Sequence, residues 1–206
     1  MRELDQIPVS SDPWRLLVLW RLPQTGAWLW KRSALEEVGG WNETQPVAQD
    51  FELYFRLLAA GKRFVYDGAS GAVYRIWSLD TVSRRNFGAT IAARLRLLAE
   101  AEGFLRSSGN LTDDRVIAIS QGRFDCARNV WSIDRDWARK IFEELQSQHP
   151  GFEPEGKAAP LPYRFVAKLL GFSAAERVAE LKRHLSLTSR RSASRRDRQK
   201  NAASHD

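Results

Sequence analysis

The sequence contains very little cysteine and histidine. Among its 206 residues there is one cysteine, Cys126, so no disulfide can form within the chain, and this favours a reducing compartment. Two of the three histidines, His184 and His205, lie close to or within a charged C-terminal segment. Because protein zinc sites need several Cys or His ligands, this shortage argues against a Cys/His metal site.

Long apolar runs are missing as well. The longest one near the N-terminus, Leu16 to Trp20, is far too short to cross a bilayer, which takes about 20 apolar residues. The first residues are polar and acidic, unlike those of a signal peptide. We therefore expect a soluble, cytoplasmic protein, with peripheral attachment at the inner face of the membrane left open as an alternative.

Positive charge is unevenly distributed along the chain. The net charge is +7, and residues 188–206 contribute +4 of it through six Lys or Arg and two Asp. The remaining +3 is spread over the first 187 residues, which weakens any case for nucleic-acid binding by the whole chain. We expect the tail to be disordered and suited to an anionic membrane surface. It lacks aromatic residues, so no specific nucleic-acid partner is expected.

Helix signals are frequent in the sequence. Asp12, followed by Pro13, and Asp134 are predicted N-caps. An apolar stripe predicts a helix from Gln49 to Ala60, with Gly61 as its C-terminal cap. Residues from 89 onward are expected to be mostly helical.

Strand signals are confined to the first half of the chain. Three short segments, 26–30, 63–66 and 72–77, are predicted strands. Between the first two, Ser33 and Glu36 have the spacing of a capping box, which predicts a short helix that Gly39 and Gly40 end.

The most specific pattern lies in residues 26–85. It reads Gly39-Gly40-Trp41-Asn42-Glu43, then Gln49-Asp50-Phe51-Glu52-Leu53-Tyr54-Phe55-Arg56, then Gly61 and Tyr74-Arg75. A lone carboxylate at a helix start is fully explained by capping. The ordered combination, however, closely resembles the second half of the catalytic domain of family 2 glycosyltransferases, which have the GT-A fold.

The resemblance implies an α/β fold class. Residues 1–87 would form a partial GT-A-like (nucleotide-diphospho-sugar transferase) domain, its acceptor half. A helical extension at 88–150, a loop plus C-terminal helix at 151–187 and a disordered basic tail at 188–206 would follow.

The resemblance also implies roles for individual residues. Asp50 matches the general base of inverting members, which takes a proton from the acceptor hydroxyl. Gln49 stands where the family usually has Glu and would lie at the acceptor. Arg56 and Arg75 match family positions that support this loop and the diphosphate side of the cleft. Trp41 and Trp77 would either stack on a sugar ring at the substrate site or pack in the protein interior.

The chain departs from the family pattern in its metal site. The intact family enzyme is expected to use Mg²⁺ or Mn²⁺, held by an Asp-x-Asp motif that is absent upstream of Asp50. Asp134-Arg135-Asp136 lies downstream, where capping explains it. Taken alone, the chain is expected to be a truncated catalytic domain that binds nucleotide-sugar poorly and turns over little or not at all.

Two functions follow as expectations. The first is inverting transfer of a sugar from a nucleotide-activated donor to a glycan or other hydroxyl acceptor, in cell-envelope or polysaccharide synthesis. A Gln-x-x-Arg-Trp motif and membrane spans are missing, which argues against a processive synthase. The alternative is a non-catalytic helical protein-interaction module in which the transferase segment is a relic.

Overall fold

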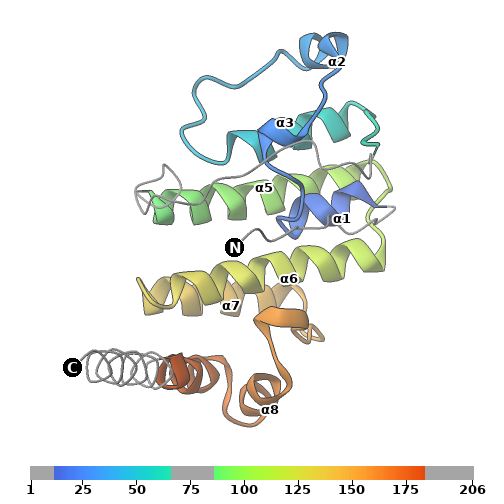
Figure 1. Cartoon of the computed structure of the whole chain (residues 1–206). Coiled ribbons are helices and arrows are strands. Elements are labelled where there is room, and N and C mark those ends of the chain that lie inside the picture. Colours follow the sequence, from blue (N-terminus) through green and yellow to red (C-terminus); the bar gives the residue numbers. More distant parts are fainter. Residues whose placement is uncertain (1–11, 66–85, 184–206) are drawn as a thin grey trace, which may run out of the picture. The chain divides into compact units, whose positions relative to one another are not determined.

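The structure, a computed structural model, describes residues 12–65 and 86–183. These residues form helices and loops and contain no strand (Figure 1). None of the described helices is both long and apolar enough to cross a membrane. The chain divides into two compact units, residues 1–152 and 153–206, which are considered separately.

Helix α6 is the centre of the first unit. It packs against α1, α5 and α7, while α3 packs against α1 and α5 (Figure 1). The helices of this unit are α1 (Pro13–Val18), the 3-10 turn η1 (Thr25–Ala27), α2 (Arg32–Glu37), α3 (Gln49–Ala59), α5 (Phe87–Ser107), α6 (Asp113–Val130) and α7 (Arg135–Gln148). The expected helix at 49–60 and the helical character after residue 89 are thereby confirmed.

The expected α/β, GT-A-like fold is wrong for the described residues. Residues 26–30 form the end of η1 and an extended stretch without a partner strand, residues 63–65 are also irregular, and residues 72–77 lie outside the described ranges. A strand needs a neighbour to bond its backbone groups. The alternating pattern of Trp28 and Trp30 has another cause here, since both rings contact Tyr54 of α3.

Side-chain caps fix two of the helix starts as predicted. Asp12 accepts a hydrogen bond from the backbone N–H of Trp14 at 3.0 Å. Asp134 accepts from Asp136 N–H at 3.0 Å and from Trp137 N–H at 2.9 Å. The boundaries of α1 and α7 are therefore local properties of the sequence.

The short helix α2 begins differently from the prediction. Lys31 occupies its N-cap position and no side chain caps the helix, so the predicted capping box is wrong. Glu36 pairs with Arg32 at 2.8 Å on the exposed surface instead. The predicted stop is confirmed, because Gly39 and Gly40 have φ of +78° and +67°, a left-handed conformation that other residues rarely adopt.

The core of the first unit is continuous around α6. Gly122 marks its tightest point, because a Cβ there would lie 2.6 Å from the Val18 carbonyl oxygen and 2.9 Å from Leu98 Cδ2. The absent side chain lets α6 approach α1 and α5 closely. Large fully buried side chains of this core come from five helices and the turn after α6: Leu17, Leu53, Tyr54, Leu98, Leu105, Ile119, Phe124, Val130, Trp131 and Leu145.

The second unit is a small helical pair. It contains the turn η2 (Gly156–Ala158), α8 (Leu161–Leu170) and a helical stretch at 172–183. Tyr163 donates its hydroxyl hydrogen to Oε1 of the fully buried Glu176 at 2.8 Å, which joins the two helices. Phe172 and Ala175 are buried beside them.

Replacing Gly122 by Ala should destabilise the first unit. The added methyl group would collide with a backbone carbonyl that cannot rotate away, and such overpacking costs about 1–3 kcal/mol. Urea unfolding followed by circular dichroism measures this. Gly103→Ala is the matched control, because Gly103 lies within α5 with nothing within 4 Å of its Cβ position. That variant should gain up to about 1 kcal/mol. Equal effects of the two substitutions would contradict the proposed contact.

Candidate functional site

Asp50 lies in the first turn of α3 but does not cap that helix. The N-cap position belongs to Ala48, which has a left-handed backbone at φ 59° and no capping side chain. The Asp50 carboxylate instead accepts a hydrogen bond from the backbone N–H of Thr25 at 3.3 Å. The carboxylate therefore links α3 to η1, and a carboxylate with about four acceptor positions retains capacity for a further donor.

Tyr54 lies one turn after Asp50 in α3 and fixes the loop that contains Pro23 and Trp28. Its hydroxyl donates to the Pro23 carbonyl at 2.8 Å and accepts from Trp28 Nε1 at 2.8 Å. Burial of the ring raises the pKa of Tyr54 strongly, and the neighbouring charge of Asp50 raises it further. Tyr54 therefore stays protonated as a hydrogen-bond donor at all ordinary pH values.

Aromatic rings from four segments gather around Tyr54, one turn after Asp50. We call this group the tryptophan cluster, and it consists of Trp28, Trp30, Trp41, Tyr54 and Phe64. Trp30 stacks on Tyr54 with 5.9 Å between ring centroids and meets Trp41 edge-on at 6.3 Å. Trp41 is 42% exposed, so the cluster has a buried base and an accessible edge. Such a surface combines a flat apolar face with N–H donors.

Of the other predicted site residues, the structure places only some near Asp50. Gln49 is adjacent to Asp50 and donates from its side-chain amide to the Pro46 carbonyl at 3.0 Å. Its amide group therefore closes the local loop in this structure. Arg75 and Trp77 lie outside the described residues.

Arg56 braces the loop that carries Trp41. Its guanidinium donates to the carbonyl oxygens of Val38 and, at 2.7 Å, of Gly40. It also forms a two-bond pair with Glu52 at 2.8 and 2.9 Å. The planar fork of arginine suits this arrangement of several acceptors. Arg56 thus holds the glycine turn against α3 in the described structure.

The described residues do not fit the divalent metal that the resemblance implies. Within these ranges no group of three or more His, Cys, Asp and Glu could hold a metal ion. Asp134 of the Asp-x-Asp sequence accepts backbone N–H groups, and Asp136 pairs with Arg139. Capping and an ion pair account for both carboxylates.

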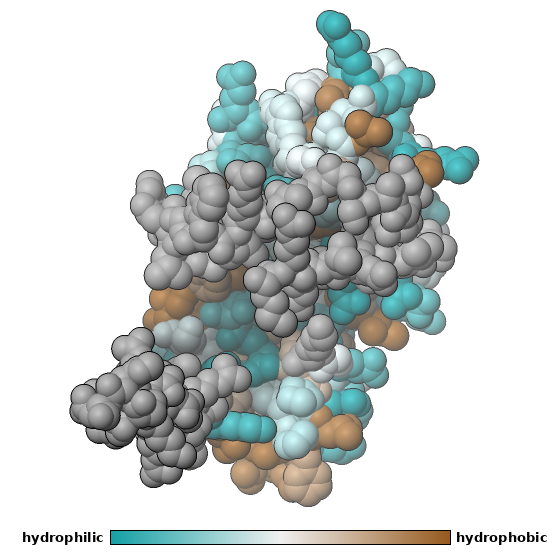
Figure 2. Space-filling view, viewed as in Figure 1, coloured by the Kyte–Doolittle hydropathy of each residue, from teal (hydrophilic) through white to brown (hydrophobic). Residues whose placement is uncertain are grey.

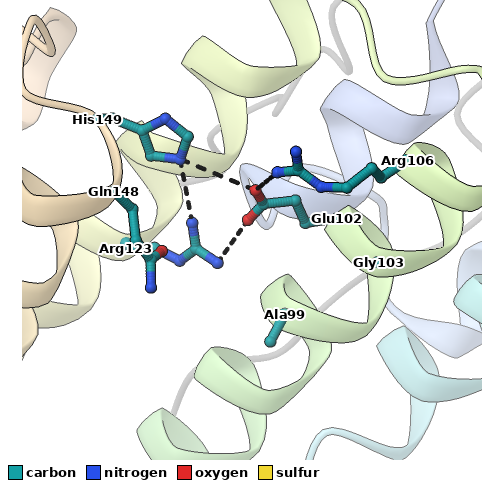
Figure 3. Close-up of a pocket in the computed structure, with 7 residues that line it drawn as sticks. All are labelled: Ala99, Glu102, Gly103, Arg106, Arg123, Gln148 and His149. Atoms are coloured by element: carbon teal, nitrogen blue, oxygen red, sulfur yellow. Dashed lines mark hydrogen bonds and ion pairs between the residues drawn. The ribbon is translucent and has the colours of Figure 1, made fainter.

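A second polar group lies in a pocket between α5, α6 and the end of α7. Glu102 projects from α5 between Arg123 at 2.6 Å and Arg106 at 2.7 Å, with His149 Nε2 at 3.9 Å (Figure 3). The pocket has a volume of about 380 Å³. Arg123 also approaches His149 at 3.4 Å. We call these four residues the Glu102 cluster.

Protonation states in the Glu102 cluster follow from its burial and its cations. Burial opposes the charge on Glu102, but Arg123 and then Arg106 outweigh it, so the pKa of Glu102 falls below its usual value. Burial also lowers the pKa of His149, and the arginines act in the same direction against the opposing effect of Glu102. Near neutral pH the cluster therefore holds a carboxylate, two guanidinium groups and a neutral imidazole.

The sequence patterns did not predict the Glu102 cluster. The one available signal was a carboxylate on the apolar stripe of α5, four residues after Leu98 and three before Leu105. His149 occupies the C-cap position of α7, which ends at Gln148. Because the charges in the cluster are mutually satisfied, its evident role is to join three helices.

Comparison with known proteins found no matching family model, no matching curated protein and no matching solved structure.

Replacing Arg56 by Lys should loosen the loop that carries Trp41. A lysine ammonium cannot reproduce the fork that bonds two carbonyls and Glu52 together, so we expect a loss of about 1–3 kcal/mol in unfolding free energy. Arg32→Lys is the matched control, because the Arg32–Glu36 pair is fully on the surface and should contribute little. Urea unfolding measures both, and an unchanged midpoint for Arg56→Lys would refute the brace.

The pKa directions in the Glu102 cluster predict acid sensitivity. The folded state resists protonation of His149 while the unfolded state accepts it, so stability is greatest above His149's usual pKa of 6.5 and falls below it. A second loss should follow below pH 4.5 as Glu102 is protonated. Unfolding free energies at pH 4 to 8 test this. His149→Asn should remove the first loss, and a pH profile unchanged by that substitution would exclude His149 as its source.

Proposed function

We propose that residues 20–65 form the acceptor side of a site that transfers a sugar from a nucleotide-activated donor to a hydroxyl group, with Asp50 as the base. The proposal rests on the resemblance of residues 26–85 to family 2 glycosyltransferases. It concerns the site residues and not the fold around them, since the described residues are helical.

One observation carries the proposal beyond the resemblance. The half-buried carboxylate of Asp50 lies one helical turn before Tyr54, and the Tyr54 ring is linked through Trp30 to the partly exposed Trp41. A pyranose ring presents C–H groups on its faces and hydroxyls at its edge, so it can stack on an aromatic ring while a hydroxyl reaches a carboxylate. Pure capping by Asp50 would need no such neighbours, and Asp50 does not occupy the capping position.

The chemistry assigned to Asp50 is a single displacement. The acceptor hydroxyl donates its hydrogen bond to the carboxylate, and its oxygen attacks the anomeric carbon of the donor. A bond between that oxygen and the anomeric carbon forms as the bond to the leaving diphosphate breaks, and the proton passes to Asp50. Such a base must lie within hydrogen-bond reach of the hydroxyl, at about 2.6–3.2 Å. Attack opposite to the leaving group inverts the anomeric centre.

Supporting residues have positioning roles in this proposal. Tyr54, held protonated and bonded to Pro23 and Trp28, fixes the base of the tryptophan cluster. Arg56 fixes the turn that leads into Trp41. Gln49, next to Asp50, would meet the acceptor after releasing Pro46.

A helical interaction module is the second candidate function. The observation that favours it is that residues 87–148 consist mainly of three long helices, which pack around α6 together with α1. In that case the tryptophan cluster would be purely structural and carbohydrate would not bind. The experiment below distinguishes the two functions.

Acceptor binding and transfer are the direct tests. Soluble oligosaccharides should quench or shift the tryptophan fluorescence of the 206-residue protein, and Trp41→Ala should weaken binding about tenfold. The chain alone is expected to turn over little, so transfer is followed in long incubations with nucleoside-diphosphate sugars. Asp50→Asn should abolish any slow release of the nucleoside diphosphate that the parent protein shows. It should leave acceptor binding nearly unchanged, since an amide oxygen can still accept from Thr25.

Controls separate these effects from misfolding. Phe165→Ala removes an exposed aromatic ring from the second unit and should leave acceptor binding unaltered. Absence of oligosaccharide binding would favour the interaction module. Equal transfer by the parent protein and Asp50→Asn would remove Asp50 from the role of base.

A further inference from the structure

The outer face of α8 is apolar and exposed. Leu161, Phe165 and Leu169 recur every four residues, so they lie on one side of the helix, and they are 76%, 67% and 64% exposed. Leu170 lies next to this stripe and is exposed as well. Figure 2 shows apolar side chains gathered over α8. Exposing large apolar side chains in a contiguous group is unusual for a surface that meets only water.

The neighbouring helical stretch at 172–183 extends this property. Val178 and Leu181 are three residues apart and both exposed. The inner sides of the two helices are already used, since Tyr163 and Phe172 are buried within the unit. The exposed apolar residues therefore take no part in the packing inside the unit, and we call them together the outer apolar face: Leu161, Phe165, Leu169, Leu170, Val178 and Leu181.

Basic side chains accompany the outer apolar face. Five Lys or Arg and two Glu lie between residues 161 and 183, which gives +3. One of the two acids, Glu176, is fully buried, bonded to Tyr163 and 3.9 Å from Arg183. Over residues 153–206 there are 12 Lys or Arg and six Asp or Glu, a net charge of +6 out of +7 for the chain. The five cations near the face are Arg164, Lys168, Arg177, Lys182 and Arg183.

We propose that the outer apolar face binds the surface of an anionic phospholipid bilayer. An amphipathic helix lying in the membrane interface buries its apolar side among the acyl chains while Lys and Arg reach the headgroups. Each basic residue near an anionic surface strengthens binding about fivefold. Nearly all of the positive net charge of the chain lies in this unit, and it complements the negative charge of an anionic lipid surface.

The same charges argue against other occupants. Two copies of this unit would bring net charges of +6 together, and like charges oppose association. A nucleic acid would match the cations but leave four exposed leucines and Val178 without an apolar partner. An acidic bilayer satisfies both the apolar and the basic side chains. This inference is independent of the proposed sugar transfer.

Vesicle cosedimentation of the 206-residue protein tests the proposal. The protein should pellet with phosphatidylcholine vesicles that contain 30% phosphatidylserine and remain in solution with pure phosphatidylcholine. Adding 0.5 M NaCl should weaken the binding. The double variant Phe165→Ser, Leu169→Ser should lower partitioning at least about tenfold, because two apolar side chains no longer enter the bilayer.

The variants are chosen so that the basic tail cannot imitate the result. The double variant keeps every positive charge of residues 153–206, so unchanged binding would assign attachment to charge alone and overturn the role of the apolar face. Ile117→Ser is the matched control, because Ile117 is an exposed apolar residue of α6 and should not affect binding. Lys168→Glu with Arg177→Glu should also reduce binding. Far-UV circular dichroism checks that each variant folds.

Two other outcomes would contradict the inference. The protein could fail to pellet with either vesicle. Alternatively, analytical ultracentrifugation without lipid could show a dimer that Phe165→Ser, Leu169→Ser dissociates, which would assign the face to a second copy of the chain.

Discussion

The approach of α6 to α1 and α5 at Gly122 is the contact on which the first unit depends. With a Cβ position only 2.6 Å from the Val18 carbonyl, the crossing exists because this residue has no side chain. Helix α6 also packs against α7, and α3 packs against α1 and α5. The Glu102 cluster then joins α5, α6 and the end of α7 by ion pairs that are mutually satisfied.

The candidate site depends on a different kind of constraint, namely hydrogen bonds from side chains of α3 to the backbone of neighbouring loops. Residues 19–48 contain only short helical turns, so their positions are determined by hydrogen bonds to α3. Asp50 holds Thr25, Tyr54 holds Pro23, and Arg56 holds Val38 and Gly40. These three side chains of one helix place the tryptophan cluster beside a carboxylate. That arrangement supports sugar transfer as a proposal, while a matching family or relative was not found.

Local patterns predicted much of the secondary structure and little of the tertiary arrangement. The caps at Asp12 and Asp134 and the helix from Gln49 were predictable because each depends on neighbours within one or two turns. The strand predicted at 26–30 is wrong, because Trp28 and Trp30 lie on one side of an extended stretch and pack against Tyr54 of α3 instead of against a sheet. Asp50 was identified as a candidate from the sequence pattern around it. The Glu102 cluster joins residues up to 47 positions apart, and its only signal in the sequence was a carboxylate on the apolar stripe of α5.

By itself, the sequence determined the capped starts of α1 and α7, the span of α3, the concentration of positive charge in the last third, and the motif that resembles a transferase. Only the tertiary structure decided that Arg56 braces the glycine turn, that Asp50 binds Thr25 instead of capping α3, and that one side of α8 faces outward. The physical reason is range. Capping and periodicity act between residues a few positions apart, whereas a clamp, a buried ion pair or an uncovered face depends on which distant segments come to lie beside them.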